Sequence, residues 1–221
     1  MTIGIEHLDE ACRPLRADAA RNRELILETA AAVFAEQGLD ASYDEIARRA
    51  GVGVGTVYRR FPERSELVQA LFESRIGEMV AIAEEAAARP DAWDGLTWFL
   101  EKSLERQVAD RGLKEVMVSV LSADAHMTIG RERIGPILED VVARAQRDGS
   151  LRADVQTTDI GMQLMMMSSM SVPGQPEIWR RYLALMIDAL RARPDQAPLP
   201  LAAPADEAMY ELMCNLHGRP S

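Results

Sequence analysis

The sequence predicts an all-α protein. Apolar side chains recur at the 3.6-residue period of a helix along almost the whole chain, and no stretch shows the strict alternation of a half-buried strand. The length of 221 residues allows one medium domain plus a small one, or a single larger domain. Hydrophobic residues make up 48% of the chain and aromatic residues 5%, so we expect a core of Ala, Leu, Val and Met.

The first expected helices carry clear start and stop signals. Five apolar residues share one face of the first helix: Leu25, Ile26, Ala30, Val33 and Phe34. Gly38 is placed to end that helix. Ser42 and Glu45 have the spacing of a capping box, in which the serine hydroxyl and the glutamate carboxylate each satisfy a free backbone donor at a helix start. The box predicts a short second helix over about 43–50.

The stretch from Gly51 to Gly55 has glycine at every second position, which raises the question of a phosphate-binding loop. A dinucleotide-binding G-x-G-x-x-G motif would need its third glycine where Thr56 or Tyr58 stands, and it would follow a strand rather than a capped helix. The Gly-Lys-Ser/Thr ending of a Walker loop is absent as well. Spacing and context therefore argue against a phosphate loop of either kind.

A helix-turn-helix accounts for more of this stretch. Gly51 fits the turn, where a positive φ suits glycine, and a third helix is expected over about 54–60. Gly53 and Gly55 would each cost that short helix on the order of 1 kcal/mol. They make sense if the backbone must approach another surface closely, and a DNA phosphate is such a surface. A structural corner whose glycines ease packing is the alternative.

The rest of the chain is also predicted to be mostly helical. A long helix is expected from Glu63 to about Ala88, and Asp91 is placed to cap the next one. Further helices are predicted over about 92–110, 112–125, 131–148, 155–171 and 176–193. The proline-rich sequence after Arg193 is expected to be extended or disordered, with one loose terminal helix over 205–217.

Charge and cysteine usage narrow the classes of function. The net charge of −10 and the pI near 4.9 give no whole-molecule attraction to nucleic acid, but five arginines against three acids give residues 42–64 a local charge of +2. Cys12 and Cys214 lie at opposite ends of the chain, which predicts a reducing, cytoplasmic location; no metal site and no cofactor are expected. No segment holds the roughly 18 apolar residues of a membrane span.

Motifs between about Arg21 and Met79 are specific enough to suggest a family. They are an Ile-Leu…Ala…Phe…Gly first helix, then Tyr-Asp-Glu-Ile-Ala…Ala-Gly-Val, Gly-Thr-Val-Tyr-Arg-Arg-Phe and Glu-Leu-Val. This stretch resembles the DNA-binding head of the tetracycline-repressor (TetR) family of bacterial transcriptional regulators. The rest of the chain resembles that family only in being helical and of suitable length.

The resemblance implies a three-helix helix-turn-helix head, joined by a long fourth helix to a helical ligand-sensing and dimerisation domain. The expected domains are an N-terminal arm (1–17), the head (18–65), the larger domain (66–193) and a proline-rich tail (194–221). Four arginines ahead of or early in the first helix either extend the basic surface of the head or belong to an ordinary solvated face: Arg13, Arg16, Arg21 and Arg23.

The resemblance also implies which residues contact DNA. They are Ser42, Tyr43, Gly53, Val54, Gly55, Thr56, Tyr58, Arg59 and Arg64. Ser42 and Tyr43 at the start of the second helix, and Arg64 at the start of the fourth, match positions that contact phosphates in the family. Arg59 is placed to reach a base edge or a phosphate. Gly53 stands where the family usually has Ser, and Val54 where a polar or basic residue is common. Base recognition there is therefore expected to use apolar contact with a thymine methyl group.

The last two strong helices, over about 155–193, are expected to form a homodimer interface. One apolar stripe consists of Ile178, Tyr182, Leu185 and Ala189. A second consists of Trp179, Leu183, Met186 and Leu190. A helix that is apolar on two faces needs two partners, its own core and something else, and a twin subunit fits the second role.

A small, mainly apolar effector is expected among the central helices. Five methionines lie between residues 162 and 170, and methionine suits cavities that accept variable apolar shapes. The expected lining residues are Trp98, Met117, Leu121, His126, Met162 and Met166. Core packing or a dimer interface is the alternative for the methionines, and a surface or capping role is the alternative for His126.

These features predict a sequence-specific DNA-binding regulator, specifically a ligand-responsive repressor that binds a palindromic operator as a dimer. An enzyme is not expected, because His7, His126 and His217 are far apart in sequence and no Gly-x-Ser-x-Gly elbow or apolar carboxylate pair occurs. An all-helical adaptor that binds only protein is the alternative. Such an adaptor would have no use for the Gly-Thr-Val-Tyr-Arg run set between basic residues.

Overall fold

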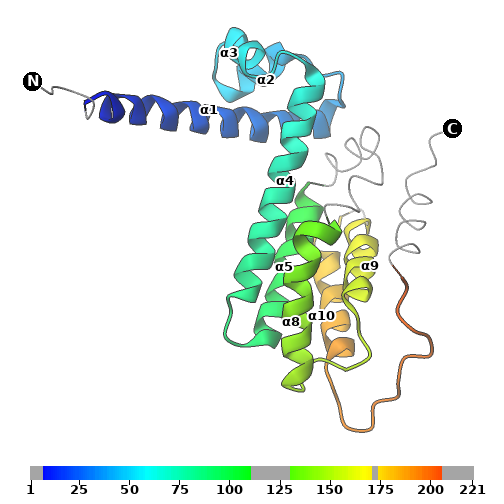
Figure 1. Ribbon diagram of the computed structural model, residues 1–221. Coiled ribbons are helices and arrows are strands. Elements are labelled where there is room, and N and C mark those ends of the chain that lie inside the picture. Colours follow the sequence, from blue (N-terminus) through cyan, green and yellow to red (C-terminus); the bar gives the residue numbers. More distant parts are fainter. Residues whose placement is uncertain (1–6, 111–129, 171–173, 206–221) are drawn as a thin grey trace, which may run out of the picture. The chain divides into compact units, whose positions relative to one another are not determined.

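The computed structural model describes residues 7–110, 130–170 and 174–205, and for residues 7–17, 19, 20, 130 and 131 it describes the backbone alone. The elements, shown in Figure 1, are α1 (His7–Gln37), α2 (Tyr43–Ala50), α3 (Val54–Arg60), α4 (Arg64–Ala87), α5 (Ala92–Ala109), the π-helical turn η1 (Gly130–Ile134), α8 (Gly135–Arg147), α9 (Thr157–Ser168) and α10 (Ile178–Leu190). No strand occurs within these ranges, so the predicted all-α fold is confirmed. None of the helices described is both long and apolar enough to cross a lipid bilayer.

The chain divides into two compact units, Met1–Glu73 and Ser74–Ser221, and the division falls inside α4. The sequence placed the boundary at residues 65–66, at the start of the same helix. The first turns of α4 carry buried side chains of the N-terminal unit, and its last turns carry buried side chains of the C-terminal unit. Of the predicted helices, 112–125 and nearly all of 205–217 lie outside the described residues.

The N-terminal unit packs α1, α2, α3 and the first turns of α4 around one core. Its fully buried side chains include Ile26, Val33, Phe34, Ile46, Val57 and Leu67. Gly38 follows α1 with a φ of 79°, and Gly51 follows α2 with a φ of 66°. Both values lie in the left-handed region where glycine is favoured, as predicted for these two helix ends.

Helix α1 begins at His7, about ten residues before the point where the sequence placed the start of the head. The residues expected to form an arm ahead of the first helix, from His7 on, continue α1 instead. Within the part whose side chains are described, Arg21 forms an exposed ion pair with Asp18 one turn earlier. This pair favours a solvated face for Arg21.

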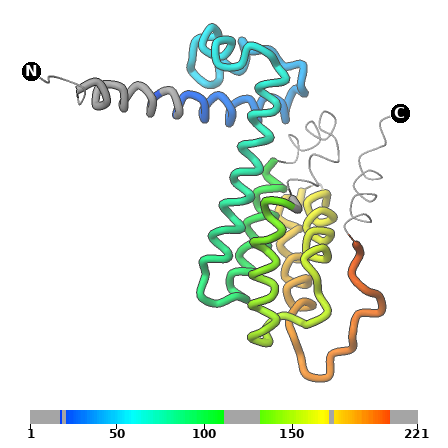
Figure 2. Tube along the Cα trace, in the orientation of Figure 1, coloured from blue at the N-terminus to red at the C-terminus, as the bar shows by residue number. Residues whose placement is uncertain are grey.

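The C-terminal unit is a helical bundle in which α5 packs against α8, α9 and α10 (Figure 1), and Figure 2 traces the chain through it. The turn that leads into α5 is closely packed. Asp91 accepts a hydrogen bond from the backbone nitrogen of Asp94 at 2.8 Å, which confirms the predicted cap. A Cβ atom at Gly95 would lie 2.5 Å from the carbonyl oxygen of Ala86, so only glycine fits at this position.

Helix α10 presents the two predicted apolar stripes, and the structure gives them different surroundings. The inner stripe is buried in the core of the bundle and consists of Trp179, Leu183, Met186 and Leu190. The outer stripe consists of Ile178, Tyr182, Leu185 and Ala189. Within it Leu185 is 57% exposed, Tyr182 and Ala189 are exposed, and Ile178 is half-buried. The outer stripe therefore lacks a partner within the described part of the chain.

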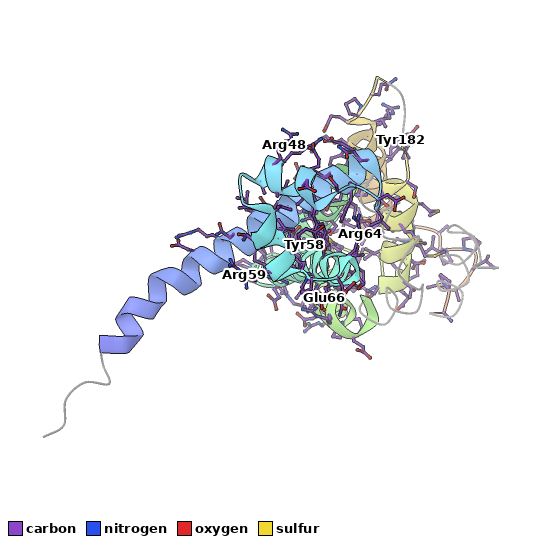
Figure 3. All side chains as sticks on the ribbon, turned by 90° about the horizontal axis from the view of Figure 1, so that it is seen from above. Arg48, Tyr58, Arg59, Arg64, Glu66 and Tyr182 are labelled. Carbon is purple, nitrogen blue, oxygen red and sulfur yellow. The ribbon has the colours of Figure 1, made fainter. Side chains whose placement is uncertain are left out.

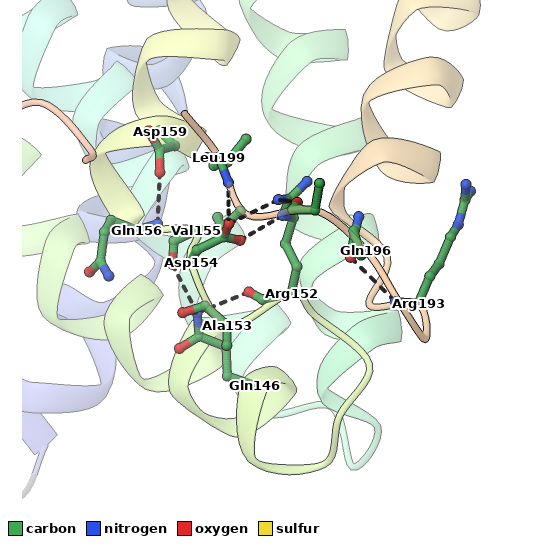
Figure 4. Close-up of polar contacts among 11 residues, drawn as sticks. Gln146, Arg152, Ala153, Asp154, Val155, Gln156, Asp159, Arg193, Gln196 and Leu199 are labelled. Carbon is green, nitrogen blue, oxygen red and sulfur yellow. Dashed lines mark hydrogen bonds and ion pairs between the residues drawn. The ribbon is translucent and has the colours of Figure 1, made fainter. Parts of the chain in front are cut away.

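After α10 the chain forms a strap, residues 191–199, that is held by the connection between α8 and α9 (Figure 4). The carboxylate of Asp154 accepts hydrogen bonds from Arg152 Nε at 2.6 Å and from the backbone nitrogen of Leu199 at 2.7 Å. Arg152 also donates to the carbonyl oxygen of Ala197 at 3.1 Å. The hydrogen bond from Arg152 and then the one from Leu199 hold the pKa of Asp154 well below its usual range. The strap has no regular secondary structure and turns at Pro194 and Asp195, where Asp195 has a φ of 60°.

Candidate nucleic-acid interface

Helices α2 and α3 pack against each other as a helix-turn-helix. Ile46 and Ala47 on α2 and Val57 on α3 are buried where the two helices meet the core. The turn is closed by the backbone nitrogen of Val52, which donates to the carbonyl oxygen of Ala47 at 3.0 Å. On the opposite side of α3, Val54, Tyr58 and Arg59 are exposed.

The glycines at the start of α3 are not required by the fold. Gly53 has a φ of −69°, which any residue can adopt, and Gly55 has no positive φ either. A Cβ atom at Gly55 would meet nothing within 4 Å, and one at Gly53 would meet only Thr56 Oγ1 at 4.0 Å. Since neither backbone conformation nor packing calls for glycine, the alternative in which the glycines ease a structural corner loses its basis.

The outer surface of α3 is formed by Gly53, Val54, Gly55, Thr56, Tyr58 and Arg59. Tyr58 is 53% exposed, Val54 and Arg59 are exposed, and Thr56 is half-buried. Figure 3 shows Tyr58 and Arg59 on this helix. Gly53 is the N-cap residue and supplies no side-chain hydrogen bond, as the absence of a Ser at this position implies. The surface therefore combines a bare backbone with one aromatic and one cationic side chain.

The start of α2 carries only half of the predicted capping box. Ser42 Oγ accepts from the backbone nitrogen of Glu45 at 3.2 Å, as predicted. The carboxylate of Glu45 instead accepts hydrogen bonds from Arg48 and Arg49, each at 2.7 Å, and these bonds lower its pKa to about 2. Arg49 also pairs with Glu36. Two of the five arginines behind the expected local charge of +2 are thus paired with acids.

Tyr43 and Arg64 lie further inside the unit than their expected contact with DNA phosphates implies. Tyr43 is 5% exposed, and its hydroxyl is buried without a hydrogen-bond partner. Arg64 is half-buried and donates from one nitrogen to the carbonyl oxygens of Leu39 and Ala41. Both side chains are more buried than Tyr58 and Arg59, which are exposed.

Comparison with known proteins places this helix-turn-helix in a family. Residues 26–71 match the family model described as bacterial regulatory proteins, tetR family, and residues 89–192 match the one described as transcriptional regulator SbtR-like, C-terminal domain. An uncharacterized HTH-type transcriptional regulator of Mycobacterium bovis is 31% identical over 144 residues, which cover 62% of this chain and 72% of that protein. The chain belongs to the TetR family of bacterial transcriptional regulators.

Two further TetR-family and HTH-type proteins extend this result. An HTH-type transcriptional regulator of Staphylococcus aureus is 35% identical over 104 residues, and the match covers 44% of this chain and about half, 54%, of that regulator. The crystal structure of a TetR transcription regulatory protein from Mycobacterium vanbaalenii superimposes with a TM-score of 0.65 at 37% identity. It covers 81% of this chain and 100% of that one. These relatives are transcriptional regulators and not enzymes, in agreement with the sequence prediction.

The residues expected to line an effector site in this TetR-family chain are only partly described. Met117, Leu121 and His126 lie outside the described residues. Trp98 on α5 and Met162 on α9 are half-buried, and the guanidinium of Arg89 lies over the Trp98 ring at 4.7 Å. Met166 is 53% exposed and lies on the surface of the bundle. The effector site stays a prediction.

Sequence reasoning missed two buried polar groups in the core of the C-terminal unit. Ser103 on α5 is fully buried, and its hydroxyl has no hydrogen-bond partner among the described residues. Within the same ranges the indole nitrogen of Trp179 on α10 is also buried without a partner. The position of Ser103 was visible in the sequence, because it follows Leu96 and Leu100 at helical spacing and so falls on an apolar face. No comparable signal marked the indole nitrogen.

Proposed function

We propose that this TetR-family regulator is a repressor that binds a palindromic operator as a homodimer and is released by a small, mainly apolar effector. The observation that carries the DNA-binding part is the outer surface of α3, where neither backbone conformation nor packing requires glycine at positions 53 and 55. A glycine that neither backbone strain nor packing explains indicates that something outside the chain approaches the backbone there. A DNA phosphate backbone is the surface that matches the family's function.

Each residue of the outer surface has a proposed role in DNA contact. The backbone at Gly53 and Gly55 approaches the phosphates, and Tyr58 donates its hydroxyl to one of them. Val54 and Thr56 face the major groove, where Val54 contacts a thymine methyl group. Arg59, which is exposed, reaches a base edge or a phosphate. At the start of α2 the exposed Ser42 completes the phosphate contacts.

Sequencing the DNA that co-purifies with the protein from its host tests this assignment. The two heads of a dimer bind half-sites about 34–36 Å apart, so the enriched DNA should contain a rough palindrome with that spacing. Recovery of no enriched sequence, together with capture of a protein partner by the same preparation, would favour the all-helical adaptor instead. An adaptor gives no reason for the bare glycines of α3.

The outer stripe of α10 supports the homodimer. Tyr182 and Leu185 are exposed apolar side chains on a helix whose inner stripe already fills the core, and Met166 on α9 is exposed as well. Burying such residues against a second copy removes apolar surface from water, with a gain of about 25 cal/mol per Å². We therefore assign the interface to the segment from about 155 to 193 and place Met166 in that interface rather than inside a ligand cavity.

The effector is proposed to bind within the C-terminal unit, beside Trp98 and Met162. The two unpartnered polar groups at Ser103 and Trp179 support a ligand that carries a hydrogen-bonding group, because buried polar groups in folded proteins are usually satisfied. Helix α4 is continuous from Arg64 to Ala87 and so belongs to both units, which makes it the candidate link between effector and DNA. Such coupling is typically about 1–3 kcal/mol, so a bound effector should weaken operator binding roughly 5- to 150-fold.

A thermal-shift screen of apolar metabolites, followed by addition of each hit to the protein–operator complex, tests the effector. Hits should raise the melting temperature and release DNA, because only a ligand that distinguishes the two states of the protein can shift the equilibrium. Hits that stabilise the protein without changing operator affinity would contradict the release mechanism. We place the protein in the cytoplasm, where its operator would be.

A further inference from the structure

Tyr43 lies between Arg64 and Tyr58 in a stack of three side chains in the N-terminal unit, in which Tyr43 is buried, Arg64 is half-buried and Tyr58 is exposed. The Tyr43 and Tyr58 rings are 4.9 Å apart at their centroids and tilted by 57°. The guanidinium carbon of Arg64 lies 5.7 Å from the centroid of the Tyr43 ring. The three side chains come from α4, α2 and α3 in turn, so the stack joins three helices.

Arg64 is held in place at one end of this stack. One of its guanidinium nitrogens donates to the carbonyl oxygens of Leu39 and Ala41, the second of these at 2.8 Å. Both carbonyls belong to the connection between α1 and α2, and the guanidinium also lies 6.0 Å from the Phe34 ring. A cation fixed by two carbonyls and two aromatic rings has little freedom to turn outward toward a phosphate.

Tyr43 contacts Tyr58 through its ring, and its hydroxyl takes no part in this contact. The hydroxyl is buried and has no hydrogen-bond partner in the part of the chain that the structure describes, and burial raises its pKa above the ordinary value. The ring contacts that of Tyr58 in a tilted arrangement, and Tyr58 is 53% exposed on a helix of seven residues. An exposed tyrosine on so short a helix would sample several rotamers, and an aromatic neighbour restricts that choice.

We propose that Tyr43 and Arg64 are positioning residues that hold Tyr58 in the orientation in which it meets a DNA phosphate, and that neither of them touches DNA. This inference rests on the proposed function, because it concerns how the outer surface of α3 is prepared for its operator. It differs from the role that the family resemblance implies for these two positions, which is direct contact with the phosphates. Preorganising Tyr58 removes part of the entropy loss on binding.

A double-mutant cycle between Tyr43 and Tyr58 tests the first half of the proposal. Replacing Tyr43 with Leu should weaken operator binding roughly 2- to 13-fold per head, which corresponds to the loss of one aromatic pair. The same replacement should have almost no effect in the Tyr58→Ala background, because its effect passes through Tyr58. Additive losses would show that Tyr43 acts independently of Tyr58 and would overturn this half.

The Tyr43→Phe variant is the matched control and keeps the cycle decisive if Tyr43→Leu folds poorly. It retains the ring and removes only the unpartnered hydroxyl, so operator affinity should stay within about twofold and the melting temperature should not fall. A tenfold loss of affinity with an unchanged melting temperature would mean that the hydroxyl reaches the DNA, and the proposal would be wrong.

The salt dependence of operator binding tests the second half. A cation that neutralises a phosphate contributes about 0.9 to the slope of log K against log salt. Replacing Arg64 with Gln should lower affinity but leave that slope unchanged, whereas replacing the exposed Arg59 with Gln should reduce it by about 0.9 per head if Arg59 meets a phosphate. A reduction of about 0.9 for Arg64→Gln would show that Arg64 itself contacts DNA.

Failure of the wild-type protein to bind any operator would instead refute the proposed function. The failure of this inference and the failure of the proposed function are therefore distinguishable.

Discussion

The outer surface of α3 and the outer stripe of α10 are both exposed faces of helices whose other side is buried, but they differ in chemistry. The outer surface of α3 carries two glycines, an exposed valine, a half-buried threonine, and an exposed tyrosine and arginine, so backbone and polar groups are accessible. The exposed positions of the outer stripe of α10 carry tyrosine, leucine and alanine, and Leu185 is 57% exposed. The first surface suits a charged, hydrogen-bonding partner such as DNA, and the second suits an apolar partner such as a second copy.

This comparison also separates two uses of glycine. Gly95 is needed inside the bundle, because a Cβ atom there would strike the carbonyl oxygen of Ala86 at 2.5 Å. Gly55 is not needed inside the head, because a Cβ atom there would meet no protein atom within 4 Å. Gly95 thus serves internal packing in the C-terminal unit. We assign Gly55 in the N-terminal unit to contact with an external partner. Substitutions at the two surfaces and at the two glycines should therefore have different effects on dimerisation, stability and DNA binding.

The largest effect is expected for Leu185→Glu. This change places an unpaired charge in the proposed dimer interface, which should cost several kcal/mol and dissociate the dimer. Operator affinity should then fall by roughly 100-fold or more, because a single head loses the contacts of its twin. Sedimentation velocity and operator titration measure the two effects.

The matched control is Leu201→Glu, since Leu201 in the tail is 82% exposed and its replacement should change neither dimerisation nor operator affinity. A Leu185→Glu variant that remains dimeric would place the interface elsewhere.

The next largest effect is expected for Gly95→Ala. The added methyl group meets a backbone oxygen, which cannot move as a flexible side chain could, so the free energy of unfolding should fall by about 1–3 kcal/mol. Gly77→Ala on α4 is the control, because a Cβ atom there meets nothing within 4 Å. Urea unfolding should show a lower midpoint for the first variant and an equal or higher midpoint for the second. Equal stability of both variants would contradict the close approach of α4 and α5.

Gly55→Ala should separate stability from binding. Alanine is favoured over glycine in a helix by up to about 1 kcal/mol, so the free energy of unfolding should stay equal or rise. Operator affinity should nevertheless fall by roughly fivefold or more, because the methyl group would crowd the DNA backbone at a close contact. Gly77→Ala again serves as the control and should leave operator affinity unchanged. A Gly55→Ala variant with full affinity would remove the main argument for the outer surface of α3.

The smallest effect concerns the acid sensitivity of the head. Hydrogen bonds from Arg48 and then Arg49 lower the pKa of Glu45 from 4.5 to about 2. A carboxyl group whose pKa is lowered by folding stabilises the folded state above its unfolded pKa, and that contribution is lost as pH falls toward 2. The stability of the wild-type protein should therefore decline more between pH 5 and pH 2.5 than that of Glu45→Gln. Parallel urea-unfolding curves across this range would contradict the pairing. Because Glu45 is solvent-accessible, added salt should shrink the difference.

Local features of the fold could be predicted from the sequence because they depend on neighbours a few residues away. The turn at Gly51, the cap at Ser42 and the inner and outer stripes of α10 all follow from short-range spacing. Glu45 was placed correctly at a helix start, but its carboxylate pairs with two arginines that follow it on the same helix. Spacing alone does not decide between two hydrogen-bonding partners within reach of the same carboxylate.

The features that the sequence could not supply depend on contacts between distant segments. Tyr43 was expected at the DNA surface, and its burial results from Tyr58 and Arg64, which other helices bring to it. The need for Gly95 arises from a carbonyl oxygen nine positions earlier, across a turn. The start of α1 at His7 also had no clear signal, because the stretch before residue 18 lacks a strong apolar period. Such contacts form only when the helices are packed.

The most direct test of the DNA-binding role of α3 is a titration of the wild-type protein with its own promoter DNA and with a scrambled duplex, repeated over a range of salt concentrations. The account predicts that the promoter is bound about 10³-fold or more tightly than the scrambled duplex. It also predicts that log K falls linearly with log salt, with a slope of several units that reflects release of counterions from the contacted phosphates. Equal affinity for the two duplexes, or an affinity that does not change with salt, would contradict it.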